Sequence, residues 1–333
     1  MTTKRNATIY DVAKAAAVSH QTVSRVINNS SSIRQSTRER VLLAMKELGY
    51  IPSAAARALV TSKSKIIGVL MTETGTNGPA SLLHAMQEEA HSEGYFAVAI
   101  SVDPETESSV TEGLQQLQKL AAEGLIVIAP QANIMKVIEK SSFAFRVVYL
   151  DKLSGSSRLT ASVDSYHAVR NATAHLIGLG HSKLLHLAGP SSWFEAEVRK
   201  QGFIDECAAA KVSGKVAAAD WSIAKGYELG LEFTKGSFTA IVAANDHLAL
   251  GLLKAFSERG IAVPEDVSII GFDDIPEAAY LIPTLTTLRP NFAEIGRVAM
   301  GLVLGKLSVE QVAKNADLLP ELIIRNSTTK PAK

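Results

Sequence analysis

Two helical stripes of apolar residues open the chain. Each stripe recurs at the three- to four-residue spacing of one helix face. Their members are Ile9, Val12, Ala13 and Ala16 in the first and Val23, Val26 and Ile27 in the second. Thr8 and Ser19 stand directly before the stripes, where their hydroxyls can cap helix N-termini. The pattern predicts two short helices that meet across a tight turn.

From Lys65 onward, short apolar runs alternate with segments of helical periodicity. The runs of a first series are KIIGVLM, YFAVAIS, LIVIAP and FRVVYLD. A second series begins with ASVD and continues with KLLHLAGP, KVAAAD, TAIVAAN and VSIIGFDD. This alternation is typical of a parallel sheet with helices on both faces. It predicts two doubly wound α/β lobes, with a ligand cleft beyond the carboxyl ends of their strands.

Charge is distributed unevenly along the 333 residues. Through Lys65 the chain carries eleven basic and three acidic residues, a net charge of +8. The remainder carries 23 basic and 30 acidic residues, a net charge of −7. The overall charge of +1 therefore hides a small basic module joined to a large acidic one. This asymmetry is expected when only one domain meets a polyanion.

The sequence disfavours several classes of protein. The opening MTTKRNATIYDV has no apolar stretch typical of a signal peptide, and no apolar run approaches the roughly 20 residues of a membrane span. Cys207 is the single cysteine, which excludes an internal disulfide and an all-cysteine metal site. We expect a cytoplasmic protein, associated with the nucleoid through DNA, that needs no metal, cofactor or membrane.

The second predicted helix carries side chains suited to DNA. In a helix-turn-helix, the second helix lies in the major groove with its first residues against base edges. Here those residues are His20, Gln21 and Arg25, and Thr22 and Ser24 are available for phosphates. The alternative is an ordinary helical hairpin with a solvated polar face, which the local positive charge disfavours.

The segment SHQTVSRVIN resembles the recognition helix of the LacI/GalR family of DNA-binding regulators, and STRERVLLAMKELGYIPSAAARALV resembles the family's third helix and hinge. The resemblance implies that His20 and Gln21 read the operator. It also implies that paired hinge helices enter the minor groove, with Leu59 wedged between base pairs and Arg57 near phosphates. The full set of expected DNA contacts is Thr8, Tyr10, Ser19, His20, Gln21, Thr22, Ser24, Arg25, Asn28, Ala56, Arg57 and Leu59.

The hinge segment SAAARALV is too short to be a stable helix by itself, because helix nucleation is costly. We expect it to become ordered only when it pairs with a second copy on DNA. Coupled folding of this kind gives a ligand in the large module a way to control DNA affinity. The alternative is an alanine-rich linker that merely tethers the two modules.

Polar residues follow three of the predicted strands. Asp151 follows RVVYL, Asn245 and Asp246 follow AIVAA, and Asp273 and Asp274 follow SIIGF. Any one of them is more typical of a helix cap or a turn than of a ligand contact. Their repetition at equivalent strand ends indicates a binding cleft.

The resemblance to the family extends to about Arg325. It is carried by GLGHSKLLHLAGPSSWFEAEVRKQGF, DWSIAKGY, IVAANDHLALGLLKAFSERGIAVPEDVSIIGFDD and YLIPTLTTLRPNF, which are similar to an effector domain of the periplasmic-binding-protein type. The resemblance implies a sugar pocket made of Asp151, Trp193, Arg199, Trp221, Asn245, Asp273 and Phe292, with Phe194 as a further candidate.

This set of side chains suits a sugar. Carboxylates, an amide and a guanidinium can hydrogen-bond to hydroxyls, and an indole face packs against the C–H side of a pyranose ring. Three members have structural alternatives. Arg199 fits a surface cation, Trp221 a core residue, and Phe292 a packing residue where the chain crosses between lobes.

The expected fold class is an all-α helix-turn-helix headpiece followed by an α/β domain of two doubly wound parallel-sheet lobes. We expect the headpiece at residues 1–51, the hinge helix and linker at 52–62, and the effector-binding and dimerisation domain at 63–329. The N-lobe of that domain should comprise 63–161 and 292–318, and the C-lobe 162–291 and 319–329.

We expect a transcriptional repressor that binds a pseudo-palindromic operator as a dimer, because the operator mirrors the two-fold axis of the protein. The chain ends at RNSTTKPAK, without the leucine-heptad tail by which some regulators of the family form tetramers. A small sugar, such as a galactoside or related glycoside, should release the DNA. The alternative is a regulator that uses a purine or another small molecule as corepressor.

Two further classes are disfavoured. Asp273 and Asp274 suggest acid/base chemistry, but adjacent residues at a strand end point apart, and the sequence has no nucleophile elbow, P-loop or metal-ligand cluster. We therefore expect no enzymatic activity. A sugar-binding protein of a transport system is opposed by the basic headpiece and by the lack of a signal peptide.

Overall fold

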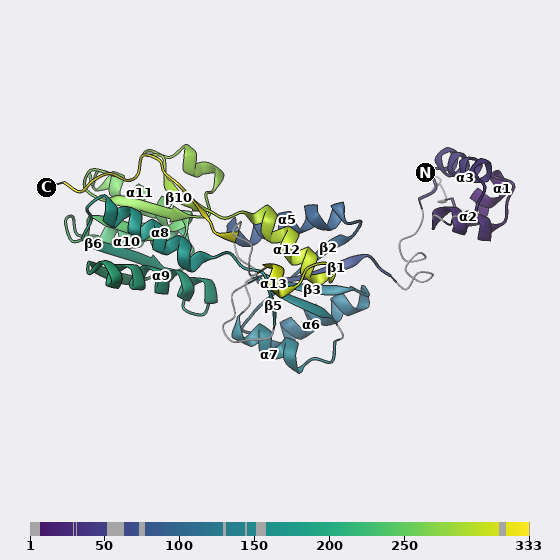
Figure 1. Cartoon of the computed structure of the whole chain (residues 1–333), viewed down its shortest axis with the longest axis horizontal. Coiled ribbons are helices and arrows are strands. Elements are labelled where there is room, and N and C mark those ends of the chain that lie inside the picture. The colour runs from purple at the N-terminus through teal and green to yellow at the C-terminus, as the bar shows by residue number, and fades with distance from the viewer. Residues whose placement is uncertain are drawn as a thin grey trace, which may run out of the picture. The chain divides into compact units, whose positions relative to one another are not determined.

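The computed structural model describes residues 7–28, 30, 32–51, 63–72, 77–128, 131–143, 145–150, 158–312 and 318–332. Contacts divide the chain into two compact units, Met1–Lys65 and Ile66–Lys333, both drawn in Figure 1. Each unit has its own hydrophobic core. We describe the two units separately.

The first unit contains three helices. They are α1 (Ile9–Ala15), α2 (His20–Ile27) and α3 (Gln35–Leu48). Thr8 and Asp11 form a reciprocal capping box at the start of α1, and the Ser19 hydroxyl accepts from the amide of Thr22 at the start of α2. Ala17 adopts a left-handed conformation with φ of 50°, which lets the chain turn sharply between α1 and α2. The predicted helix-turn-helix is confirmed.

The core of this unit is small and consists of short side chains. Val12 and Val23 are completely buried between α1 and α2, and Val41 closes the core from α3. Val26, Ala13, Ala16 and Ala44 complete the buried set. Small side chains allow the helices to approach closely. Because α2 packs through its two valines, its polar face remains on the surface.

The first lobe of the second unit, here the N-lobe, has five parallel strands in the order β2-β1-β3-β4-β5. The strands are β1 (Ile66–Thr72), β2 (Phe96–Val102), β3 (Gly124–Ile128), β4 (Arg146–Leu150) and β5 (Leu159–Thr160). Leu70 of β1 is in register with Ile100 of β2 on one side and with Val127 of β3 on the other. Strand β3 is buried throughout, as expected for a parallel strand covered on both faces.

Four helices cover the two faces of the N-lobe sheet. They are α5 (Asn77–Ser92), α6 (Glu107–Lys119), α7 (Ala132–Lys140) and α12 (Phe292–Val303). Figure 1 shows α5 and α12 on one side of the strands and α6 and α7 on the other. Met86 and Ala299 lie in the core under the first pair, and Leu114 and Ile134 lie in the core under the second. A short helix, α13 (Val309–Val312), follows α12.

The second lobe, here the C-lobe, has six strands in the order β11-β10-β9-β8-β6-β7. They are β6 (Lys183–Ala188), β7 (Ser213–Ala218), β8 (Ala240–Ala243), β9 (Ser268–Phe272), β10 (Thr286–Arg289) and β11 (Glu321–Ile323). All neighbours pair in parallel except β10 and β11, which are antiparallel. Strand β11, which follows α12 and α13 along the chain, therefore lies at the edge of the C-lobe sheet.

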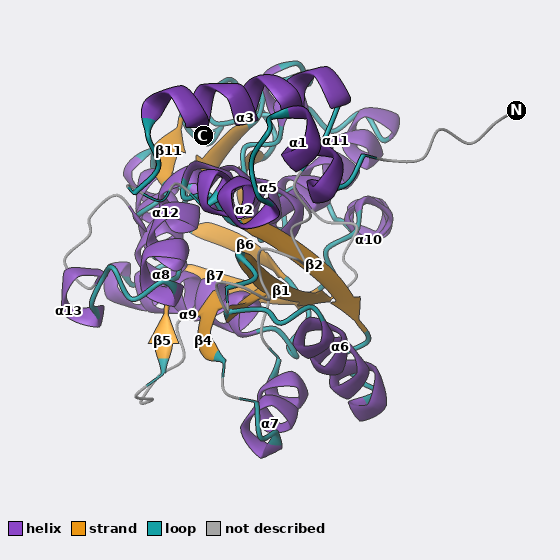
Figure 2. Ribbon diagram, turned by 90° about the vertical axis from the view of Figure 1, so that its right-hand side faces the viewer, coloured by secondary structure: helices purple, strands orange, loops and turns teal. Residues whose placement is uncertain are grey.

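Helices also cover both faces of the C-lobe sheet. Figure 2 shows these helices around the labelled strands β6 and β7. They are α8 (Ser165–Gly178) and α9 (Phe194–Ala210) on one face, and α10 (Ile223–Glu232) and α11 (Asp246–Glu258) on the other, with a 3₁₀ turn at Pro276–Ala279. Cys207 lies on the buried face of α9, and burial raises the pKa of its thiol to about 11. This thiol is a packed hydrophobe rather than a nucleophile.

The expected two-lobed α/β architecture is confirmed. The prediction that the second series of strands begins with ASVD, residues 161–164, is wrong. Residues 161–164 form no strand; instead β5, just before them, extends the N-lobe sheet beside β4. The Asp164 carboxylate accepts from the amide of His167 and caps α8. The sequence ASVD therefore connects the lobes and starts a helix, because its aspartate satisfies an otherwise free helix N-terminus.

Within the described residues, no helix is both long and apolar enough to cross a membrane. The same residues contain no group of three or more His, Cys, Asp or Glu side chains placed to hold a metal ion.

Candidate functional site

A pocket lies where the two lobes face each other. Six of the seven residues expected in the effector site line it: Trp193, Arg199, Trp221, Asn245, Asp273 and Phe292. The seventh, Asp151, lies outside the described residues. These six residues come from widely separated segments, and the fold brings them together at the carboxyl ends of the strands and the starts of the following helices.

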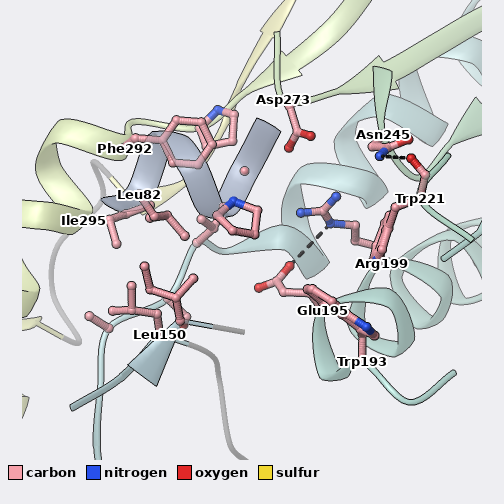
Figure 3. A pocket seen from close by; sticks show the side chains of 17 residues that line it. Leu82, Leu150, Trp193, Glu195, Arg199, Trp221, Asn245, Asp273, Phe292 and Ile295 are labelled. Atoms are coloured by element: carbon pink, nitrogen blue, oxygen red, sulfur yellow. Dashed lines mark hydrogen bonds and ion pairs between the residues drawn. The ribbon is translucent and has the colours of Figure 1, made fainter. Parts of the chain in front are cut away.

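The pocket has two unlike walls, as Figure 3 shows. One wall is apolar and is contributed mostly by the N-lobe. Its members are Pro79, Leu82, Ile128, Leu150, Ala161, Val163, Pro290, Phe292 and Ile295. The other wall belongs to the C-lobe and carries Trp193, Glu195, Arg199, Trp221, Asn245 and Asp273. About 700 Å³ of space lies between them, part of it continuous with solvent.

Arg199 is the only cation among the described lining residues, and it is buried rather than on the surface. Its Nη1 donates to the carbonyl oxygen of Ala244 over 2.6 Å, and its guanidinium lies 3.5 Å from the ring centre of Phe272. Its Nε faces a carboxylate oxygen of Glu195 at 3.4 Å and makes no hydrogen bond within the described part of the chain. The interpretation as an exposed helix cation is wrong, and a buried donor is left available.

Asp273 follows β9 and lies nine-tenths buried in the pocket. Its backbone has a φ of 107°, a left-handed conformation that is unusual for a residue other than glycine. Burial raises the pKa of its carboxyl to about 7, with Arg199 lowering it and Glu195 raising it. The carboxyl is thus close to half-protonated near neutral pH and can accept or donate a hydrogen bond.

Asn245 is both a helix cap and a pocket residue. Its Oδ1 accepts from the amide of Leu248 at the start of α11, over 2.9 Å. Its Nδ2 donates to the carbonyl oxygen of Trp221 over 3.0 Å. The cap interpretation and the pocket interpretation are therefore compatible, because one carboxamide ties the start of α11 to the loop that carries Trp221.

The two indoles lie side by side on the C-lobe wall. The ring centres of Trp193 and Trp221 are 5.6 Å apart, in an edge-to-face arrangement. The Nε1 of Trp221 is buried and has no hydrogen-bond partner among the residues that the structure describes. Because the chain has only these two tryptophans, its tryptophan fluorescence reports on this pocket alone.

Sequence reasoning missed several lining residues. Glu195 stands one helical turn before Arg199 and resembles an ordinary exposed ion pair of a helix. Leu82 and Ile295 resemble core positions of α5 and α12, and nothing in their spacing separates a buried face from a pocket face. Phe194, in contrast, packs against the N-lobe core and is not among the described lining residues.

Asp246 and Asp274 do not line the pocket. Asp274 pairs with Arg325 at 2.7 Å and with Arg289 at 2.5 Å. The carboxylate of Asp246 is completely buried and accepts from the hydroxyl of Thr287 over 2.6 Å. Of the two adjacent aspartates, only Asp273 lines the cleft, so these two residues do not face it as a pair.

The helix-turn-helix presents a polar face to solvent. His20, Gln21 and Arg25 are exposed on α2, and Tyr10 of α1 contacts His20 with ring centres 5.3 Å apart. Of the other expected contacts in this unit, Ser19 and Asn28 are exposed, while Thr8, Thr22 and Ser24 are half-buried. The Thr22 hydroxyl lies 3.0 Å from that of Ser19. The expected hinge contacts Ala56, Arg57 and Leu59 lie outside the described residues.

Comparisons with known proteins agree with both units. A model of the lacI family of bacterial regulatory proteins matches residues 8–53, and a model of the periplasmic binding protein-like domain matches residues 173–328. The chain is 35% identical over 96% of its length to the transcriptional repressor PurR of Haemophilus influenzae, of which it covers 98%. It is 31% identical over 97% of its length to the lactose operon repressor of Escherichia coli, of which it covers 90%.

The similarity in structure is equally extensive. The lac repressor dimer bound to operator and the anti-inducer ONPF matches with a TM-score of 0.84 and 29% sequence identity, over 98% of this chain and 100% of that chain. The helix-turn-helix and the two parallel-sheet lobes point to the same family as the relatives that match nearly the whole chain. This chain therefore belongs to the LacI family of DNA-binding transcriptional repressors.

Proposed function

We propose that this chain represses transcription as a homodimer on a pseudo-palindromic operator and releases the DNA when a small sugar or glycoside fills the pocket. The observation that carries this proposal is the convergence of Trp193, Arg199, Trp221, Asn245 and Asp273 on one wall of a single pocket, with Phe292 opposite. These groups are acceptors, donors and ring faces, which is the set that sugar recognition requires.

The polar wall is suited to the sugar ring. The unpaired Nε1 of Trp221 and Nε of Arg199 can donate to ring hydroxyls, and the Asp273 carboxyl can accept from them. The apolar wall, which includes Leu82, Phe292 and Ile295, is suited to the non-sugar part of a glycoside. A galactoside or a related glycoside with an apolar aglycone fits both walls at once.

The exposed face of α2 supplies the DNA contacts in this proposal. His20, Gln21 and Arg25 read base edges in the major groove, and the half-buried hydroxyls of Thr22 and Ser24 reach phosphates. Thr8, Tyr10, Ser19 and Asn28 complete the contacts of the headpiece. Hinge contacts through Ala56, Arg57 and Leu59 are part of the same proposal.

The mechanism follows from the position of the pocket between two lobes. A ligand that touches both walls stabilises one arrangement of the lobes over others, so it shifts the equilibrium by its difference in affinity for them. We expect the sugar-bound arrangement to disfavour pairing of the hinges, which lowers operator affinity. The proposal assigns the protein to the cytoplasm, with its DNA, and gives it no catalytic role.

A purine corepressor is the second candidate, because the PurR repressor of Haemophilus influenzae is among the relatives at 35% identity. In that case the ligand would strengthen operator binding instead of weakening it. The two candidates therefore predict opposite signs for the same binding experiment.

The proposal is tested by titrating the full chain with methyl galactosides, aryl galactosides, hypoxanthine and guanine while tryptophan fluorescence is recorded. Ligands that change the fluorescence are then added to a gel-shift assay with an operator obtained by selection from random duplexes. We expect a glycoside to change the fluorescence and to weaken the shift. A purine that strengthens the shift, with glycosides inert, contradicts the sugar proposal.

A further inference from the structure

The charges of the pocket point to the charge of its ligand. Among the described lining residues, the ionisable side chains are Glu195, Arg199 and Asp273, which are two acids and one base. A pocket built for a phosphate or a carboxylate normally offers an excess of cationic donors. This one offers a single guanidinium between two carboxyls.

That guanidinium is already engaged. One of its amino groups donates to the Ala244 carbonyl, its face lies on Phe272, and Glu195 lies 3.4 Å from its Nε. The Arg199 charge is therefore balanced within the protein by Glu195. Little of it remains to compensate a negative charge on a ligand.

Glu195 is held in place by a buried hydroxyl group. The Ser165 hydroxyl donates to its Oε2 over 2.6 Å, and Ser165 itself is completely buried. Glu195 is the second residue of α9, and Ser165 is the first residue of α8. The hydrogen bond from the first turn of α8 therefore fixes the direction of a carboxylate on the first turn of α9. Figure 3 shows it on the C-lobe wall beside Arg199.

We propose that Glu195 determines the charge class of the effector: the pocket admits neutral hydroxylated ligands and rejects anionic ones such as uronosides and sugar phosphates. This inference rests on the proposed effector pocket and names the kind of ligand it takes. An anionic group on the C-lobe wall would lie near Glu195, and like charges repel. A neutral hydroxyl can instead donate to the same carboxylate.

A test that needs no knowledge of the effector uses quenchers of different charge. Trp193 and Trp221 are both half-buried on the wall that carries Glu195, so their fluorescence samples the charge of that wall. Iodide, acrylamide and caesium are added to the full chain at constant ionic strength. We compare the wild type with Glu195→Gln, which keeps the shape and removes the charge, and with Glu197→Gln as a control. Glu197 lies on the same helix but pairs with Lys200 and does not line the pocket.

We expect Glu195→Gln to raise quenching by iodide about twofold or more, to lower quenching by caesium, and to leave acrylamide unchanged. Glu197→Gln should behave as the wild type. An equal rise with iodide and acrylamide would mean that the substitution merely opens the pocket. That outcome overturns the proposal, as does unchanged quenching by iodide.

A second test uses matched ligands. Methyl galactoside and methyl galacturonoside differ only in a hydroxymethyl group against a carboxylate, and the glucose pair provides a second comparison. We expect the wild type to bind the neutral member at least about tenfold more tightly, and Glu195→Gln to reduce that ratio to about threefold or less. A ratio that Glu195→Gln leaves unchanged overturns the proposal. If none of the four ligands binds, the proposed sugar function fails, while the quencher result still decides the role of Glu195.

Discussion

The indole of Trp221 lies directly against the backbone of Gly189. A Cβ atom at position 189 would lie 2.4 Å from Cη2 of that ring, which is closer than any side chain tolerates. Gly189 follows β6, so the end of one strand provides the flat surface on which a pocket residue rests. The position of this ring in the pocket therefore depends on the absence of a side chain at residue 189.

We predict that Gly189→Ala displaces Trp221 and weakens effector binding by at least about tenfold. Overpacking should also lower the free energy of unfolding by about 1–3 kcal/mol. Operator affinity without ligand should stay near the wild-type value, because the headpiece is untouched. Fluorescence titration and gel shifts measure the two affinities. Wild-type effector affinity in this variant would show that the ring does not hold the ligand.

Arg199→Lys tests the geometry of the guanidinium. A lysine keeps the charge, but a single ammonium cannot donate to Ala244 and lie on Phe272 while it also faces Glu195. We predict a loss of effector affinity of about 10- to 100-fold, with the operator still bound, so that the variant represses without responding to ligand. Unchanged induction in a reporter strain would contradict this.

Asp246 should make stability depend on pH. Burial and, to a lesser extent, the nearby Asp273 raise the pKa of its carboxyl to about 8. The hydrogen bond from Thr287 opposes this rise and is included in that value. The folded protein thus holds a proton that the unfolded chain has lost above about pH 4. The associated stability is fully present below that pH and is lost as the pH rises through about 8.

We predict that Asp246→Asn, which cannot titrate, flattens the pH dependence of unfolding between about pH 4 and 8. Its amide oxygen can still accept from the amide of Ile275, while its amide nitrogen replaces the oxygen that accepts from the Thr287 hydroxyl. The wild type should lose a contribution on the order of a few kcal/mol that the variant does not lose. Urea unfolding at each pH measures the difference. Parallel curves for the two proteins would show that Asp246 is ionised in the fold at neutral pH.

Gln21→Ala and His20→Ala test the reading of DNA. Both side chains are exposed at the start of α2, so neither contributes to the core of the headpiece. We predict a loss of about 1–3 kcal/mol in preference for the operator over a variant site, with little change on non-specific duplex. Competition gel shifts measure this preference. A uniform loss on all duplexes would indicate contacts to phosphates only.

Much of this fold could be predicted because its signals are local. Val12 and Val23 mark helix faces, and Thr8 and Ser19 mark helix starts. The run that becomes β3 is apolar throughout, and the run that becomes β9 is apolar after its first residue. The exception was the sequence ASVD, which resembles a short strand. Its aspartate caps α8. The amide of Asp164 donates to the carbonyl of Leu318, a contact with a distant segment that the local sequence does not reveal.

The site was harder to predict, because its remaining members depend on contacts between distant segments. Glu195 acquires its role from Ser165, which is 30 residues away. Asp246 and Asp273 have the same residue type and the same kind of place after a strand, yet one is sealed beneath the pocket and the other lines it. No spacing in the sequence distinguishes such a pair.

In the proposed mechanism, a ligand in this pocket controls operator binding. The most direct measurement follows tryptophan fluorescence and the anisotropy of labelled operator in one titration with a glycoside that binds. We predict that both signals change over the same ligand concentrations, with the operator released, and that Arg199→Lys moves both curves to higher concentration together. Filling of the pocket with no change in operator binding, or release of the operator that Arg199→Lys does not affect, would contradict the claim.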